Sequence, residues 1–422
     1  MSEMLSTDPY KGVRDFYPAD WAVLQALLGS ARETLLKWGY EEYNASPLER
    51  AELYEAKTSE EIVNEQTYTF TDRGDRRVTL RPEMTPTLAR MVAAKRRELA
   101  FPLRWFSIGN RFRYERPQKG RLREFYQADV DLVGLPEGEA DIEIVTLASR
   151  ILRDLGADES EFSIRLNSRP LLNAACKAAG LEDEKARTYV RLLDKKSKMT
   201  DEEFAAASSE ISAKDPLSFI ENAGEAPEVS EEKKKLLDRI ETLKARGVAN
   251  AVFNPAVTRG FDYYTGMVFE IFDTNPENSR SIFGGGRYDR LVALFGGDPI
   301  PAVGFAIGDV TLADFAQTHG LAQKAATDKP QLYLGTPGAG DIPAAQAFAD
   351  TLRAQGCRIF VNLTERGLGD QIKDAVKHGI PFFAAYGANE VERGALRLKT
   401  LATGKESELP ASEIPSRLRM DN

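Results

Sequence analysis

The sequence predicts a large α+β domain followed by a small α/β domain. Three observations lead to this prediction: strands in hairpin patterns recur in the first part, a helix-rich stretch interrupts them, and strands alternate with helices near the C-terminal end. We place the domains at residues 1–325 and 330–422, with the helical insertion at about 169–248. With 422 residues, 42% of them hydrophobic, the chain is long enough to bury a large core.

The composition excludes several kinds of site. A sequence pI near 5.2 argues against indiscriminate polyanion binding, so nucleic-acid contacts are expected only at local basic patches. Two cysteines, Cys176 and Cys357, are too few for a disulfide framework or a Cys-rich metal site. The two histidines, His319 and His378, are expected on surface helices. We therefore predict no metal site formed by protein side chains.

The chain is predicted to be cytoplasmic and not bound to a membrane. Its N-terminus lacks a basic segment followed by an apolar one. No stretch approaches the roughly 20 apolar residues that a membrane span requires.

The first elements are a helix, a strand and a hairpin. Apolar residues recur at helical spacing from Trp21 to Leu35, and Gly39 is placed to end the helix. The segment YEEYNASPLE is predicted to be a strand that ends at Pro47. The hairpin TYTFTDRGDRRVTL turns at 72–75 and leads into RPEMT ahead of a helix. Glu83 and Thr85 in this loop either cap the helix or bind a ligand.

Residues 103–134 are predicted to form two strands around a basic loop. Seven cations lie between positions 104 and 123: Arg104, Arg111, Arg113, Arg116, Lys119, Arg121 and Arg123. The two-residue period of a strand places Arg111, Arg113 and Glu115 on one face before the loop, and Phe125, Gln127, Asp129 and Asp131 on one face after it.

These two faces form a polar floor if the strands pair. An arginine offers a planar fork to carboxylate or phosphate, an aromatic ring offers a stacking plane, and a carboxylate accepts from an amino group, which together suit an amino acid and a nucleotide. The alternative is an edge hairpin with a solvated charged face. Such a face has no need of Phe125.

The sequences FRYER and REFYQADVDLVG resemble motif 2 of the class II aminoacyl-tRNA synthetases, and the loop RPQKGR resembles histidyl-tRNA synthetases in particular. The order helix, Gly, strand, Pro in residues 21–47 resembles motif 1, which lies at the dimer interface of class II enzymes. The resemblance implies a class II catalytic domain with an antiparallel sheet flanked by helices. It also implies that Glu83 and Thr85 hold the α-amino group of the substrate.

The insertion is predicted from a change in composition. A helix at 141–155 and the strand FSIRLNS come before it. From about 169 to 248 the chain is rich in Ala, Lys, Glu and Asp and poor in aromatics, which predicts solvated helices rather than core. Histidyl-tRNA synthetases carry a helical insert here that touches the tRNA acceptor arm.

The stretch FNPAVTRGFDYYTGMVFEIF, residues 253–272, is the most specific signal in the chain. Its second half is predicted to be a strand. A core strand would not normally carry Arg, Asp and two tyrosine hydroxyls in six positions, because each needs a buried partner. The stretch closely resembles the signature of histidyl-tRNA synthetases, in which the Arg contacts the α-phosphate and the second Tyr faces the imidazole. Those roles fall on Arg259 and Tyr264.

Residues 281–312 contain FGGGRYD and PAVGFAIGDVTL. Three consecutive glycines allow a backbone to approach a ligand closely. Tyr288 matches a family residue near the substrate side chain, and the second sequence resembles motif 3. The family ends motif 3 with Glu-Arg, and that Arg holds the γ-phosphate of ATP; here Val310 and Thr311 stand instead. Either nucleotide binding is weakened or Arg116 or Arg121 compensates, and we expect compensation.

The last unit alternates strands and helices. QLYLGTP, CRIFVNL and PFFAAYG are predicted strands, helices are predicted at 342–355 and 369–377, and a polar hairpin follows at 396–408. This order implies a small sheet with parallel pairs. GTPGAGD lacks the Lys-Ser/Thr of a phosphate loop and is predicted to be a plain turn. The unit resembles the anticodon-binding domain of several class II synthetases.

The resemblance implies activation of histidine by ATP, with magnesium, to histidyl-adenylate and transfer of the acyl group to tRNA(His). A homodimer is expected. The implied histidine-binding residues are Glu83, Thr85, Arg113, Gln127, Asp131, Tyr264 and Tyr288. The implied ATP-binding residues are Arg113, Glu115, Phe125 and Arg259, of which Arg113 and Arg259 are catalytic. The implied tRNA acceptor contacts are Gln118, Arg121 and Arg123.

Three alternatives remain open. Asp131 either accepts from the imidazole or only pairs with a nearby arginine. A paralogue that senses histidine as a regulatory subunit of ATP phosphoribosyltransferase would keep the core, and the departure at Thr311 favours it; such proteins usually lose the signature at Arg259 and the C-terminal domain, which are present here. The stretch 259–266 argues against another class II specificity.

Overall fold

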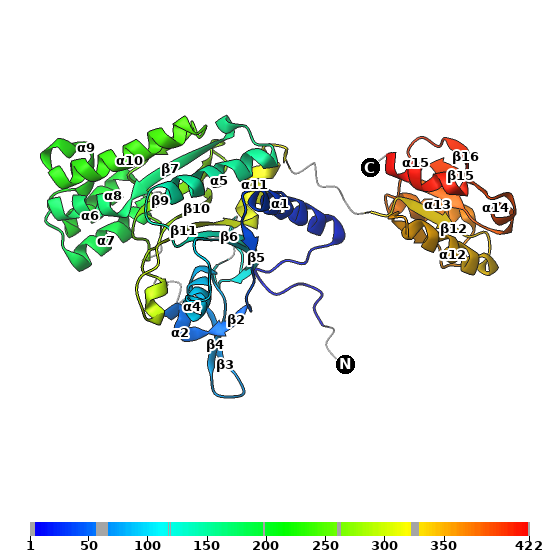
Figure 1. Ribbon diagram of the computed structural model, residues 1–422, viewed down its shortest axis with the longest axis horizontal. Helices are drawn as coiled ribbons and strands as arrows, with labels where there is room; N and C mark the ends of the chain where they lie inside the picture. Colours follow the sequence, from blue (N-terminus) through cyan, green and yellow to red (C-terminus); the bar gives the residue numbers. More distant parts are fainter. Residues whose placement is uncertain are drawn as a thin grey trace. The chain divides into compact units, whose positions relative to one another are not determined.

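The computed structural model describes residues 5–55, 66–116, 118, 120–196, 199–259, 263–321 and 329–420. The chain forms two compact units, residues 1–325 and 326–422 (Figure 1). Two positions of the basic loop, Pro117 and Lys119, and residues 260–262 of the second site segment lie outside the described residues. Within the described ranges, no helix is long and apolar enough to cross a membrane.

The first unit is built on a sheet that has eight strands in the described part of the chain, in the order β1-β5-β6-β11-β10-β9-β7-β8. The strands are β1 (Glu41–Glu42), β5 (Leu103–Phe112), β6 (Glu124–Val133), β7 (Phe162–Ser168), β8 (Ala251–Phe253), β9 (Met267–Asp273), β10 (Ser281–Arg287) and β11 (Ala302–Gly308). The pairs between β5 and β7 are antiparallel, and the outer pairs β1/β5 and β7/β8 are parallel. The predicted class II fold and the hairpin at 103–134 are therefore confirmed.

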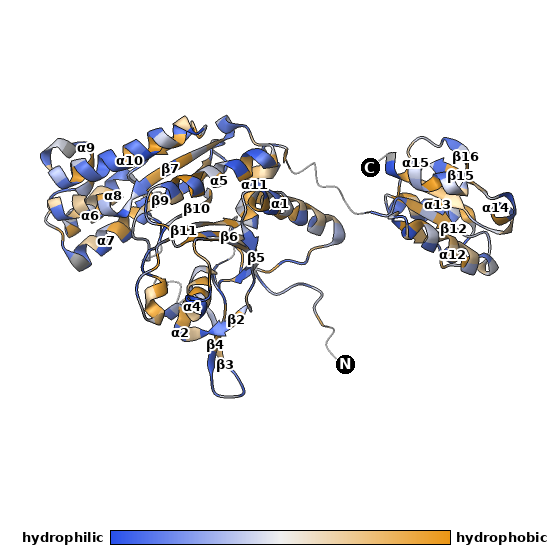
Figure 2. Ribbon diagram, viewed as in Figure 1, coloured by the Kyte–Doolittle hydropathy of each residue, from blue (hydrophilic) through white to orange (hydrophobic). Residues whose placement is uncertain are grey.

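One face of this sheet is covered by three helices: α1 (Pro18–Lys37), α5 (Glu139–Leu155) and α11 (Asp309–Thr318). The helices cover this face because side chains alternate along a strand and β6 directs its apolar residues to it. These residues, Ala128, Val130 and Leu132, are fully buried. Figure 2 shows hydrophobic residues concentrated along the central strands. The helix predicted from Trp21 begins at Pro18 and stops before Gly39, whose φ of 79° is available to glycine at little cost.

The opposite face of the sheet carries a smaller layer made of β2 (Leu48–Arg50), α2 (Ala51–Glu55), β3 (Tyr68–Thr71), β4 (Arg77–Leu80) and α4 (Thr85–Lys95). The predicted strand that ends at Pro47 is wrong in extent: only β1 forms within it, and β2, which follows Pro47, belongs to a different sheet. Turn chemistry explains the break. The Asn44 side chain accepts from the Ala45 amide at 2.8 Å, and Ser46 Oγ accepts from the Leu48 amide at 3.1 Å across Pro47.

The helical insertion is α6 (Arg169–Ala178), α7 (Asp183–Asp194), α8 (Asp201–Ile211), α9 (Pro216–Glu221) and α10 (Pro227–Ala245). The helices were predicted, but their predicted exclusion from the core is wrong. Leu172, Tyr189, Leu236 and Leu243 are buried and belong to the same hydrophobic cluster as the sheet. The low aromatic content hid this, because leucines at helical spacing supply the apolar faces.

The second unit is a sheet that, in the range 329–420, has the order β13-β12-β14-β15-β16. Its strands are β12 (Leu332–Gly335), β13 (Ile359–Val361), β14 (Phe382–Ala385), β15 (Ala395–Thr400) and β16 (Glu406–Pro410), and its helices are α12 (Ile342–Arg353), α13 (Leu368–Lys377), α14 (Ala388–Arg393) and α15 (Ile414–Met420). Parallel pairing of β12 with β13 and β14 agrees with the predicted order. The short helices α14 and α15 were not predicted.

Candidate active site

The polar floor predicted on β5 and β6 exists, but Arg111, its arginine on β5, is buried. The register places Arg111 opposite Phe125, and Arg111 Nη2 lies 2.6 Å from Asp129 Oδ2 with both side chains buried. A solvated face is therefore excluded. Arg113 and Glu115 lie beyond Phe112, the last residue of β5, so the floor continues into the loop.

Asp131 is held by a tyrosine rather than by an arginine. The Tyr288 hydroxyl donates to Asp131 Oδ1, and both side chains are buried. Burial raises the pKa of Asp131 to about 8, although the hydrogen bond from Tyr288 opposes this shift. The alternative in which Asp131 only pairs with an arginine is thus wrong, because Arg111 is engaged by Asp129 instead.

Several buried polar atoms on Asp131 and its surroundings on this side of the sheet have no hydrogen-bond partner in the described structure. They include Asp131 Oδ2, Gln127 Oε1 and the Tyr43 hydroxyl. Burial raises the pKa of the Tyr43 hydroxyl well above its ordinary value, and the nearby Asp131 carboxylate raises it further. Leaving such atoms unpaired costs about 1–3 kcal/mol each, so the cluster is suited to a polar ligand that supplies the missing partners.

Glu83 lies at the other side of this pocket and does not cap α4. The N-cap of α4 is Met84, without a side-chain cap, while Glu83 Oε2 accepts from the Tyr263 hydroxyl at 3.0 Å. Thr85 also interacts with Tyr263. The ring of Tyr263 contacts those of Tyr264 and Tyr288, with centroids 4.9 Å and 5.9 Å away, respectively. Glu83 and Asp131 are thereby linked through one aromatic wall.

Arg259 is held in a strained backbone conformation. Its φ is 59°, which a non-glycine residue adopts only when the surroundings impose it, and its carbonyl accepts from Arg169 at 2.8 Å. Arg259 Nη1 lies 3.1 Å from Glu270 Oε1, and Nη2 donates to the Gly284 carbonyl at 3.0 Å. Burial opposes the charge, yet Tyr264 and Glu270 raise the pKa of Arg259 above its ordinary value. The group is a permanent, half-buried cation.

Two of the consecutive glycines make room for these side chains. A Cβ at Gly284 would overlap the Phe269 carbonyl oxygen of β9 and come within 3.1 Å of Arg259 Nη1, and one at Gly286 would come within 2.7 Å of the Met267 carbonyl oxygen and 2.8 Å of Tyr264 Cδ1. Gly304 on β11 has the same role beside Asp131. The glycines therefore give space to site side chains, in addition to any approach of a ligand to the backbone.

The loop after β5 brings an arginine beside an aromatic plane. Arg113 Nε donates to the Pro82 carbonyl at 3.0 Å, and its guanidinium lies 5.3 Å from the centre of the half-buried Phe125 ring. Glu115 Oε2 lies 3.0 Å from Arg121 Nη1. Arg113 thus connects the floor to the segment that carries Glu83.

The three residues predicted to touch tRNA differ in their surroundings. Gln118 and Arg121 are exposed and pair through their backbones. Arg123 is half-buried and contacts two exposed tyrosines: its Nη1 donates to the Tyr10 hydroxyl at 3.0 Å, and its guanidinium lies 4.0 Å from the centre of the Tyr114 ring.

The motif 3 positions carry no cation. Thr311 Oγ1 donates to the Ile282 carbonyl at 2.6 Å. Asp309 accepts from Arg14 at 2.5 Å and from the Tyr126 amide at 3.0 Å, so Arg14 is neutralised. His319 at the end of α11 was expected on the surface; instead its ring is largely buried and lies 2.8 Å from Asp273.

Within the described residues there is no group of three or more His, Cys, Asp or Glu side chains arranged to hold a metal ion.

Comparison with known proteins agrees with this geometry. Residues 12–311 match the family model for histidyl-tRNA synthetase, and residues 334–420 match an anticodon binding domain. The chain belongs to the histidyl-tRNA synthetase family. The histidine–tRNA ligase of Leptospira biflexa is 38% identical to this family member over 99% of the chain and 98% of its own length.

Solved structures share the fold of this histidyl-tRNA synthetase family member. A histidyl-tRNA synthetase from Nostoc matches with a TM-score of 0.79 at 23% identity, covering 99% of this chain and all of that one. A Bacillus halodurans structure described as an ATP phosphoribosyltransferase regulatory subunit/histidyl-tRNA synthetase matches with a TM-score of 0.68 at 22% identity, covering 86% and 94%.

Sequence reasoning missed Tyr43 in this family member's candidate site, and it missed the partner of Tyr263. Tyr43 was assigned to a regular strand, and nothing in its sequence neighbourhood marks it as a pocket residue. Tyr263 was seen as part of the signature, but its bond to Glu83 joins positions 180 residues apart. Only the folded chain reveals such contacts.

Proposed function

We propose that this chain is a histidine–tRNA ligase that forms histidyl-adenylate from L-histidine and ATP and then esterifies the 3′ end of tRNA(His). The unpaired buried atoms at Asp131, Gln127 and Tyr43 are the observation that carries the proposal. An imidazole has two ring nitrogens, one of which donates while the other accepts. It can therefore give Asp131 Oδ2 a donor and leave its second nitrogen to a tyrosine hydroxyl.

Histidine binding is assigned to both sides of the pocket. Asp131, Tyr264 and Tyr288 face the imidazole, and Gln127 lies on the same strand face. Glu83 and Thr85 receive the α-ammonium group, since Glu83 is buried and offers a carboxylate next to Tyr263.

Adenylation is assigned to two arginines. Arg113 bridges the substrate carboxylate and the α-phosphate of ATP, and Arg259 neutralises the charge that develops as the carboxylate oxygen attacks phosphorus. Glu115 and Phe125 hold the adenine. This reaction needs positioning and charge neutralisation rather than a protein nucleophile. The restrained guanidinium of Arg259 supports this role, because its geometry is set before substrate arrives.

Magnesium is proposed to enter with ATP and to neutralise its phosphates. Gln118, Arg121 and Arg123 are proposed to contact the tRNA acceptor end, and residues 330–422 to bind the anticodon. The motif 1 resemblance supports a homodimer, and the activity supports a cytoplasmic location. The division at about residue 325 is supported by separate hydrophobic clusters in the two units.

The second candidate is a regulatory paralogue that binds histidine without charging tRNA. Thr311, in place of the motif 3 arginine, and the similarity to the Bacillus halodurans structure favour it. The presence of Arg259 and of the anticodon-binding domain argues for the ligase.

Amino-acid-dependent ATP–pyrophosphate exchange with all twenty amino acids tests the proposal. We expect exchange with histidine and magnesium. Arg113→Ala and Arg259→Ala should each lower it by about two or more orders of magnitude, as expected on removal of a charge-stabilising donor. Arg73→Ala, at the exposed turn of the β3–β4 hairpin, serves as the control and should retain full activity. A folded chain without exchange would favour the regulatory candidate.

A further inference from the structure

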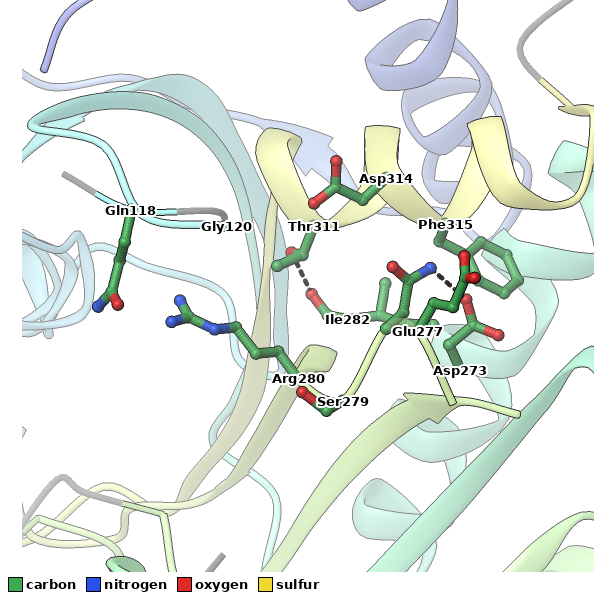
Figure 3. A pocket seen from close by; sticks show the side chains of 11 residues that line it. Gln118, Gly120, Asp273, Glu277, Ser279, Arg280, Ile282, Thr311, Asp314 and Phe315 are labelled. Atoms are coloured by element: carbon green, nitrogen blue, oxygen red, sulfur yellow. Dashed lines mark hydrogen bonds between the residues drawn. The ribbon is translucent and has the colours of Figure 1, made fainter. Parts of the chain in front are cut away.

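A pocket lies between the β9–β10 connection and the start of α11. It encloses about 210 Å³, and its lining includes Gln118, Gly120, Arg280, Ile282 and Thr311 (Figure 3). It thus joins the basic loop to the motif 3 position. None of the residues assigned to histidine lines it.

Arg280 is the only cation among the described residues that line this pocket. Figure 3 shows its guanidinium directed toward Gln118 and Gly120 and away from Asp273 and Glu277. A Cβ at Gly120 would lie 3.3 Å from Arg280 Cδ and 3.4 Å from Nη1, so the side chain rests against the loop backbone. No ion pair of Arg280 occurs in the described part of the chain.

The pocket is lined by three carboxylates, Asp273, Glu277 and Asp314, and within the described residues none of them forms an ion pair with Arg280. Asp273 is engaged by His319 at 2.8 Å and by Asn278 at 2.7 Å. Two other arginines near the loop are paired, Arg121 with Glu115 and Arg14 with Asp309. Arg116 is exposed and does not line the pocket. Arg280 is therefore available to an anion from outside the protein.

The pocket and the proposed adenylation site meet the same strand, β10, two residues apart. Arg259 donates to the carbonyl of Gly284, and two residues earlier the carbonyl of Ile282 accepts from Thr311 at the base of the pocket. Two residues of a strand span roughly 7 Å. An anionic chain that starts at Arg259 and follows the strand therefore reaches the pocket within the length of a triphosphate.

We infer that Arg280 binds the terminal phosphates of ATP and the pyrophosphate that leaves, in place of the cation missing at Thr311. This rests on the proposed function. When the histidine carboxylate bonds to the α-phosphorus, the bond from that phosphorus to the bridging oxygen breaks and its electron pair leaves with pyrophosphate. The planar fork of Arg280 is suited to bind two phosphate oxygens and to stabilise that charge.

Equilibrium dialysis of labelled ATP and AMP, each with magnesium, tests this assignment. Arg280→Ala should weaken ATP binding by roughly tenfold to a hundredfold, the value of a charge-assisted hydrogen bond or two, and leave AMP binding unchanged. The KM for pyrophosphate in the exchange reaction should rise in parallel. Arg97→Ala, another exposed arginine without an ion pair in the described chain, should change none of these.

A rescue experiment separates loss of charge from loss of shape. In Arg280→Ala, the added change Thr311→Arg places a guanidinium on the facing wall of the same pocket and should restore most of the ATP affinity. Equal losses of ATP and AMP binding, unchanged ATP binding in Arg280→Ala, or a folded double variant without recovery would each overturn the assignment. If the unmodified chain shows no histidine-dependent exchange, the proposed function itself fails, whatever Arg280 does.

Discussion

At the scale of single residues, the burial of Asp131 lowers the stability of the folded chain. A buried carboxylate is stable as an ion only with donors around it, and Asp131 has one, Tyr288, with its second oxygen unpaired. The nearby Asp129 raises its pKa further. A ligand that provides the missing donor removes this free-energy penalty on binding, and a ligand without the donor does not, so the site selects for the first.

Replacement of Asp131 should change the KM for histidine but not the KM for ATP. Asp131→Ala should raise the KM for histidine by about a hundredfold or more, because a site that loses a buried hydrogen-bonding group rejects its partner strongly. The KM for ATP should stay nearly constant, since Asp131 belongs to the wall shared with Tyr288. Steady-state exchange kinetics measure both constants. A parallel change in the two, or no change, would remove Asp131 as the imidazole-reading group.

The same carboxylate should make stability depend on pH. Its pKa is about 8 in the folded chain against an ordinary value of 3.8, so between these values the folded state holds a proton that the unfolded state has lost. This contribution is fully present below pH 3.8 and is lost as pH rises through 8, at about 1.4 kcal/mol per unit.

Asp131→Asn keeps the shape and removes the titration. The Tm of this variant, relative to the unmodified chain, should therefore be higher at pH 8 than at pH 5 when both are measured without ligand. A Tm difference that is constant across this range would show that Asp131 does not carry the raised pKa.

At the scale of elements, the glycines of β10 decide how closely the strands of the sheet approach. A Cβ at Gly285 would overlap the Gly304 carbonyl oxygen and lie 2.6 Å from Phe305 Cα on β11. Neither is the movable end of a side chain. The two strands would have to separate, and β11 also pairs with β6, which carries Asp131.

Gly285→Ala should therefore lower the stability of the first unit by about 1–3 kcal/mol or more, the usual cost of overpacking. Gly29→Ala in α1 is the matched control, because no atom lies within 4 Å of its added Cβ and alanine favours a helix. Thermal unfolding measures both. Equal Tm values for Gly285→Ala and the unmodified chain would contradict the close approach of β10 and β11.

The insertion also acts at this scale, because its helices brace the signature segment. Arg169 at the start of α6 donates to the Arg259 carbonyl at 2.8 Å, and Asp194 at the end of α7 accepts from Thr258 at 3.0 Å. These contacts lie at Arg259 and its neighbour. Among the described residues of the site, Arg259 is the one with a left-handed backbone. The insertion therefore helps to hold Arg259 in place.

At the scale of the whole molecule, the two units divide the proposed labour. The hydrophobic clusters of the second unit contain only residues between 332 and 418, so its core does not depend on the first. None of the residues assigned to adenylation lies there.

A chain that stops at Lys329 should retain pyrophosphate exchange and charge tRNA poorly. The loss of one contact of about 1.4 kcal/mol already lowers affinity tenfold, and an anticodon-binding unit supplies several. Aminoacylation of tRNA(His) measures the effect, with sedimentation as the control for a change in oligomeric state. Equal charging by the short and full chains would refute the anticodon assignment.

The sequence by itself determined the fold and most of the candidate site. Strand period two put Gln127, Asp129 and Asp131 on one face, and turn residues placed the hairpins, because both are local properties of the chain. The motif resemblances pointed to Arg113, Arg259 and Tyr264, since their chemistry is unusual for core sequence.

Only the tertiary structure decided which partners these residues have. Three pairs join positions 18, 157 and 180 residues apart: Arg111–Asp129, Tyr288–Asp131 and Tyr263–Glu83. The two-residue period of a strand predicts which face a side chain is on, but not which residue lies opposite it. The location of Arg280 opposite Thr311 is of the same kind. The physical reason is that burial and pairing depend on packing between segments, which no local pattern contains.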